Sequence, residues 1–140
     1  MPEREKLLSV CEEWVVKAEN DLTNAAHALK LGETCPTDTV CFHAQQCVEK
    51  YLKSVLVLDG IDFPRTHDLE TLVALVPARL RPGITAEEQA GLTEYATAAR
   101  YPGWEEVSLT EARRAVAVAR RVRGEVRRAL PRDALRRKKD

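Results

Sequence analysis

The sequence has few of the residues from which many active sites are built. It contains 3 histidines, 6 glycines and only 5% aromatic residues among its 140 positions. No glycine-rich phosphate loop, dinucleotide-binding motif, zinc-protease motif or serine-hydrolase motif occurs in it. A bound phosphate would therefore have to be held by arginine side chains or by helix N-termini.

Long apolar runs are also absent, and so is the alternating pattern of β-strands. No segment approaches the roughly 20 apolar residues that span a bilayer, and the first ten residues, MPEREKLLSV, do not resemble a signal peptide. We therefore expect a cytoplasmic protein that does not bind membranes. The cysteines form no C-x-x-C pair, so we expect reduced, partly buried thiols and neither a metal site nor a cofactor; they are Cys11, Cys35, Cys41 and Cys47.

The net charge of zero conceals a division of charge along the chain. Residues 110–140 contain 12 Lys or Arg against 4 Asp or Glu, whereas residues 1–109 contain 10 against 18. This asymmetry indicates either a basic surface for phosphate or acidic partners, or neutralisation of the acidic part within the fold. Sequence alone leaves both alternatives open.

Apolar residues recur at helical spacing throughout the chain. The pattern predicts helices over residues 10–31, from about 40 to Gly60, from Leu69 to Val76, from about 86 to 99, and from about 111 to 130. Thr85 to Glu88 fits a capping box, and Thr110 is the expected cap of the last helix. We predict an all-α, up-and-down antiparallel bundle of about five helices over residues 1–131, followed by a frayed basic tail at 132–140.

The second of these helices carries polar and apolar residues away from its core stripe. Phe42 and Val57 point away from that stripe, and Gln45 and Gln46 place two amides near the middle of the helix. A second copy of the chain would bury this face and allow the amides to pair. We therefore expect a homodimer whose interface includes Phe42, Gln45, Gln46 and Val57.

Two strings within residues 42–69, FHAQQCVEKYLKSVL and GIDFPRTHDL, resemble the HEPN family of small helical domains. Trp14, Ala18, Asp21 and Leu22 resemble the first-helix pattern of that family, and the Ala99-Arg100-Tyr101-Pro102 segment resembles its R-Y-P segment. The resemblance covers most of residues 10–130 and implies a helical bundle. The resemblance also implies a possible activity, because many HEPN proteins are metal-independent ribonucleases that use an Arg and a His, separated by about four to six residues, near the start of the last helix. None of His27, His43 and His67 has an Arg at that distance before it, so we expect no such activity.

Within the matching segments, Arg65 and Arg100 are the candidate phosphate ligands, with Tyr101 and His67 beside them in the sequence. The two segments are expected to meet at one end of the bundle. The alternative for these arginines is an internal ion pair, for instance with Asp21 or Asp68.

Three functions remain open from the sequence. The first is a non-catalytic, homodimeric HEPN module that acts with a minimal nucleotidyltransferase, in a pair of the toxin–antitoxin kind, and binds a nucleotide. The resemblance supplies this partner. The second is a diverged HEPN ribonuclease toxin, and the third is a structural adaptor. RNA binding by the arginine-rich face of the last helix is a further alternative.

Overall fold

The computed structural model describes residues 2–135 and consists of five α-helices joined by loops and short 3₁₀ turns. The helices are α1 (Pro2–Leu29), α2 (Thr37–Leu58), α3 (Leu69–Leu75), α4 (Ala86–Ala96) and α5 (Leu109–Ala129). The predicted all-α bundle is confirmed, and residues 2–135 contain no β-strand. None of the helices described combines the length and apolar content needed to cross a membrane.

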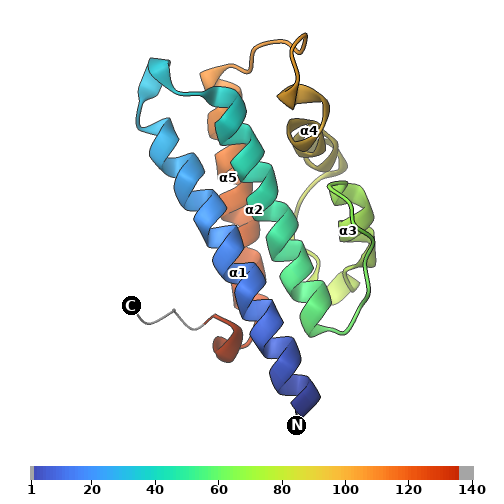
Figure 1. The fold of residues 1–140 in the computed structure, drawn as a ribbon. Coiled ribbons are helices and arrows are strands. Elements are labelled where there is room, and N and C mark those ends of the chain that lie inside the picture. Colours follow the sequence, from blue (N-terminus) through green and yellow to red (C-terminus); the bar gives the residue numbers. More distant parts are fainter. Residues whose placement is uncertain (1, 136–140) are drawn as a thin grey trace.

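Helix α2 is the centre of the bundle and contacts each of the other four helices. In Figure 1, α1 and α2 lie side by side in opposite directions with α5 behind them, while α3 and α4 lie on the other side of α2. The Thr37 hydroxyl donates to the carbonyl of Val107 (2.6 Å), which ties the start of α2 to the start of α5. The longer helices α1, α2, α4 and α5 therefore alternate in direction, as an up-and-down bundle requires.

The apolar stripe predicted for the second helix forms the core. Val40, Ala44, Val48, Tyr51 and Leu52 are completely buried. They meet small residues from α5, including Ala112, Ala115 and Ala119, and Leu69 with Leu72 from α3. Small side chains on α5 facing larger ones on α2 allow these two helices to pack closely.

Helix ends follow local capping chemistry, with some differences from the sequence expectations. Thr85 and Glu88 form the predicted capping box of α4, and Asp68 caps α3. The cap of α5 is Ser108, whose hydroxyl accepts from the Glu111 amide (3.1 Å), and not Thr110 as expected. A cap lies just outside the first helical residue, and α5 already begins at Leu109.

The two ends of the chain extend the packed structure beyond the predicted limits. Helix α1 begins at Pro2 and not near residue 10, because its first two turns are polar and give no apolar stripe to read. After Pro131, Arg132–Ala134 forms a 3₁₀ turn that places Ala134, fully buried, against α1. The rest of the predicted tail, residues 136–140, lies outside the described residues.

All four cysteines are free and buried. Burial raises the pKa of the Cys11 thiol to about 11 and that of Cys41 to about 12, and it raises the pKa of Cys47 further. As the sequence predicted, none of the four is in a disulfide, and all four are more deeply buried than the partial burial expected. Within the described residues, no group of three His, Cys, Asp or Glu side chains is placed to hold a metal ion.

Candidate functional site

A cluster around Glu49 occupies the middle of α2. The Glu49 carboxylate, which is 2% exposed, accepts hydrogen bonds from Gln45 (3.1 Å) and Gln46 (3.3 Å), and it is bound by Lys53 (2.9 Å). Nδ1 of His67, from the loop between α2 and α3, lies 2.8 Å from the same carboxylate. Burial acts to raise the pKa of Glu49, but the hydrogen bonds from Lys53 and His67 outweigh it and hold this pKa below its usual range.

The loop that carries His67 is fixed to α2 by further contacts. The Gln45 amide donates to the His67 carbonyl (3.0 Å), so the loop returns from the end of α2 to its middle. The Lys53 ammonium lies over the rings of Trp14 (5.3 Å) and Phe63 (5.6 Å), which joins α1 to this loop by cation–π contacts.

A second charged cluster joins α1 to the same side of α2. Asp21 on α1, only 7% exposed, binds Nδ1 of His43 (2.9 Å) and the Lys50 ammonium (2.6 Å). We call these two clusters together the α2 polar seam; its members are Asp21, His43, Gln45, Gln46, Glu49, Lys50, Lys53 and His67. Each seam histidine has one ring nitrogen on a carboxylate, and each carboxylate also has a lysine partner.

A third cluster links α1, α2 and α5 near the seam. Arg123 on α5 binds the Glu19 carboxylate through two nitrogens (2.7 and 3.1 Å), and the Tyr51 hydroxyl donates to the same carboxylate. Burial opposes ionisation of Glu19, but hydrogen bonds from Arg123 and Tyr51 hold its pKa below the usual range. Part of the acidic–basic asymmetry of the sequence is therefore neutralised inside the fold.

The seam gives Gln45 and Gln46 a different environment from the one the sequence suggested. Gln45 is completely buried and Gln46 is 8% exposed. Their amides are satisfied within the chain, because Gln46 donates to Gln45 (2.7 Å) and both donate to Glu49. They therefore do not need a second copy to pair with. Phe42 and Val57 are half-buried at opposite ends of α2, and the ring of Phe42 packs edge-on against His43 (5.5 Å).

Of the predicted phosphate ligands, His67 and Tyr101 lie at different points along α2. His67 contacts Glu49 in the middle of the helix, and Arg65 is exposed in the same loop. Tyr101, 68% exposed, lines a separate cavity at the helix start, together with Thr37. Thr37 and Gln45 are eight residues apart, about 12 Å along the helix. The Arg100 side chain lies outside the described residues.

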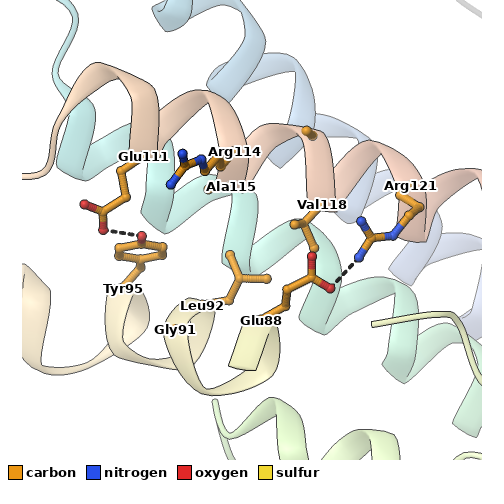
Figure 2. Close-up of a pocket in the computed structure, with 10 residues that line it drawn as sticks. Glu88, Gly91, Leu92, Tyr95, Glu111, Arg114, Ala115, Val118 and Arg121 are labelled. Carbon is orange, nitrogen blue, oxygen red and sulfur yellow. Dashed lines mark hydrogen bonds and ion pairs between the residues drawn. The ribbon is translucent and has the colours of Figure 1, made fainter. Parts of the chain in front are cut away.

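A groove between α4 and α5 is the second candidate site, and Figure 2 shows it from the side of the two helices. Its volume is about 380 Å³. Gly91 and Leu92 of α4 and Ala115, Ala117 and Val118 of α5 form its apolar lining. We call this feature the α4–α5 groove.

Two contacts across the α4–α5 groove mark its ends, as the dashed lines in Figure 2 indicate. At one end Glu88 of α4 binds Arg121 of α5 (2.5 Å), and at the other the Tyr95 hydroxyl donates to Glu111 (2.5 Å). Between them Arg114 lies on the α5 side and makes no ion pair within the described chain. The groove thus has an apolar floor and a charged rim.

The arginine-rich face of the last helix is visible in the sequence, but the α4–α5 groove is not. Gly91 and Ala117 are small residues in its lining, but the sequence does not mark them, because Ala90 and Leu92 flank Gly91 and Val116 and Val118 flank Ala117. The relative position of the two helices, moreover, depends on the packing of both against α2.

Residues 11–129 match the sequence model of the HEPN domain. The chain belongs to the HEPN domain family. The resemblance seen in the α2 segment is thereby confirmed over most of the protein.

Solved structures agree with this HEPN assignment. TT1696 from Thermus thermophilus superposes with a TM-score of 0.71 at 25% identity, covering 86% of this chain and 98% of that one. ST0689, described as an archaeal HEPN homologue, superposes with a TM-score of 0.63 at 27% identity, covering 85% and 96%.

A curated relative matches over a shorter length. The Methanocaldococcus jannaschii protein named "Putative toxin MJ1304" is 46% identical over 52 residues. The match spans 37% of this chain and 32% of that protein. It therefore relates a part of this HEPN chain to a part of a protein with a toxin name.

Proposed function

We propose that this HEPN protein is one member of a toxin–antitoxin pair, that it acts by binding and not by catalysis, and that it is a homodimer that works with a minimal nucleotidyltransferase. The local similarity to a protein named as a toxin supports the toxin–antitoxin context. The nucleotidyltransferase as partner rests on the family resemblance of the α2 and R-Y-P segments.

The observation that carries the proposal is the pairing of the polar groups in the α2 polar seam. His43 and His67 are the histidines closest to a catalytic arrangement, and each is held on a carboxylate that is also neutralised by a lysine. Among the side chains that the structure describes, which exclude Arg100, no buried nitrogen or oxygen lacks a hydrogen-bond partner. A seam in which every group is satisfied holds α1, α2 and the loop together and supports a structural role.

Co-purification tests the partner. The proposal requires a minimal nucleotidyltransferase gene beside that of this chain, and its tagged product, expressed together with the chain, should retain it through size-exclusion chromatography in a stable complex. A nucleotidyltransferase from an unrelated pair is the matched control. If neither protein retains the chain, or both do equally, the proposed partnership is wrong.

A ribonuclease assay separates this proposal from the diverged toxin enzyme. Purified protein, incubated with unstructured RNA and a chelator, should leave the RNA intact. RNA cleavage that is lost in His43→Ala or His67→Ala would overturn the non-catalytic role. Either histidine would then act through the ring nitrogen that does not face its carboxylate.

Nucleotide binding near Arg65, Arg100, Tyr101 and His67 stays a prediction. Arg65 is exposed in the loop after α2, whereas Tyr101 lines a cavity at the start of that helix. We expect Arg65 to make the phosphate contact, because its guanidinium can pair with phosphate oxygens, and Tyr101 to affect affinity less. Calorimetry with ATP on the wild type, Arg65→Ala and Tyr101→Ala measures this. Equal affinity in all three proteins would place the nucleotide elsewhere.

A further inference from the structure

We propose that the cavity between the start of α2 and the loop before α5 binds an arginine side chain of a partner protein. We call it the Tyr101 cavity. Its volume is about 430 Å³, and its lining comes from residues 35–38 and from the segment between Ala99 and Val107. The inference goes beyond the proposed function, because it depends neither on a nucleotidyltransferase nor on a nucleotide.

Two exposed aromatic rings line the Tyr101 cavity. The Tyr101 side chain is 68% exposed and that of Trp104 is 42% exposed. The other large apolar side chains exposed in the described chain, Val10 and Leu31, are not aromatic. Neither ring makes a hydrogen bond or a ring contact with another described side chain. The cavity therefore presents aromatic faces that the fold itself does not use, and such faces attract organic cations.

A tight turn brings these two rings together. The Trp104 amide donates to the Tyr101 carbonyl (3.4 Å), and Gly103 between them has a φ of 98°. A glycine at positive φ after a proline is typical of a type II turn, whose first and last Cα atoms lie within about 7 Å of each other. The Thr37 hydroxyl, bonded to the Val107 carbonyl (2.6 Å), fixes this loop to α2. The walls of the cavity are thus held in place before a ligand arrives, which lowers the entropy lost on binding.

The charged residues in the lining are all acidic. Asp38, Glu105 and Glu106 line the cavity, all three are exposed, and none makes an ion pair within the described chain. The described lining residues include no Lys, Arg or His. The two segments that supply most of the lining, residues 31–49 and 101–112, also contain no Lys or Arg. The Tyr101 cavity is therefore complementary to a positively charged group.

An arginine side chain satisfies both features of the cavity. Its planar guanidinium can stack on an aromatic ring while its N–H groups pair with carboxylate oxygens. A lysine ammonium has no planar face and matches only the charge. RNA and other phosphate-bearing partners would be repelled by the three carboxylates, which agrees with Arg65, and not Tyr101, as the expected phosphate contact. Because the rings and carboxylates are exposed, a partner's side chain can enter from solvent while its backbone stays outside.

An NMR titration with the peptide acetyl-GGRGG-amide tests the site. The chain contains two tryptophans, Trp14 and Trp104, so isotopically labelled protein gives two indole N–H signals, and Trp104→Phe assigns them. The Trp104 signal should shift and saturate as peptide is added, whereas the Trp14 signal should stay in place. The peptides acetyl-GGQGG-amide and acetyl-GGEGG-amide have the same length without the positive charge, and neither should produce a saturable shift.

Variants of the lining separate the contributions of charge and ring. Glu105→Gln with Glu106→Gln keeps the side-chain shape but removes two carboxylates, and it should raise the dissociation constant of the arginine peptide about tenfold. Tyr101→Ala should raise it by a similar factor, because one cation–π face is lost. The matched control, Glu3→Gln with Glu5→Gln, removes the same charge where α1 begins, at the opposite end of α1 from the cavity (Figure 1), and should leave the constant unchanged. Circular dichroism establishes that each variant is folded.

Three results would each overturn the proposal. The first is a Trp104 signal that the arginine peptide does not shift, or that the glutamine peptide shifts equally. The second is a loss of affinity in the control variant as large as that in the variant of the cavity. The third is a saturable shift of the Trp104 signal by ATP alone, because the cavity would then take a nucleotide and not a cation. Retention of the chain by the nucleotidyltransferase is measured separately, so failure of one proposal leaves the other distinguishable.

Discussion

The α2 polar seam and the α4–α5 groove differ in what their charged groups contact. In the seam, Asp21 and Glu49 are nearly inaccessible and each binds both a lysine and a histidine. At the groove, one ion pair and one hydrogen bond join the helices, while Arg114 between them is exposed and makes no ion pair within the described chain. The seam uses its charges to hold one chain together.

This difference indicates how one small bundle can separate stability from recognition. A buried charge must be paired within the fold, because its desolvation is not otherwise offset. An exposed charge contributes little to folding and is available for a partner. Substitutions in the seam should therefore change the free energy of unfolding, whereas substitutions of exposed charges at the groove should change it little.

Removing the centre of the seam should have the largest effect. Glu49→Ala leaves Lys53 buried without its carboxylate, and Gln45 and Gln46 lose an acceptor. Loss of one partner of a buried ion pair typically costs about 3–5 kcal/mol. We expect the free energy of unfolding, measured by urea denaturation, to fall by that order. Glu94→Ala, at an exposed position of α4, is the matched control and should change it by less than about 0.5 kcal/mol. Similar losses in the two variants would contradict this separation of stability from recognition.

Acid should weaken the seam and the neighbouring Glu19 cluster. The pKa values of Glu49 and Glu19 are held below their usual value of 4.5 in the folded chain. Their contribution to stability is therefore present above about pH 4.5 and is lost as the pH falls through the lower folded-state pKa values. Denaturation across this range should show stability falling with acid. Glu49→Gln, which does not titrate, should reduce the slope; an unchanged slope would argue against Glu49 as a source.

The capping box of α4 should contribute less to the free energy of unfolding than the seam does. Thr85→Ala removes the hydroxyl that accepts from the Glu88 amide (3.1 Å), and loss of such a cap typically costs about 1 kcal/mol. Thermal unfolding measures the change. Thr110→Ala is a suitable comparison, because Thr110 is exposed on α5 and Ser108 is the cap there. An effect of Thr110→Ala as large as that of Thr85→Ala would contradict this assignment of caps.

The sequence alone predicts the features that depend on residues close together in one helix. The apolar stripe of α2 and the Thr85 capping box follow from spacing within one helix, and both are confirmed. The first two turns of α1 were missed because they lack an apolar stripe. Ser108 was missed because Thr110, two residues later, is an equally good cap by residue type.

The candidate site depends on contacts that spacing does not reveal. The amides of Gln45 and Gln46 were assigned to a dimer interface because their acceptor was not visible from the helix alone. In the structure that acceptor is Glu49, one turn along α2, and it is covered by His67 from a loop 18 residues further on. Another segment of the same chain can cover one face of a helix, and only the tertiary structure shows which face is covered.

The buried thiols can be used to measure how readily different parts of the bundle open. Thiolate is the form that reacts with alkylating reagents, and burial opposes its formation at Cys11, Cys41 and Cys47. Cys11 lies on α1, while Cys41 and Cys47 lie in the first half of α2. Each must be exposed by a separation of helices before it can be labelled. The alkylation rate of each cysteine, followed by mass spectrometry, would therefore measure how readily its own part of the bundle opens.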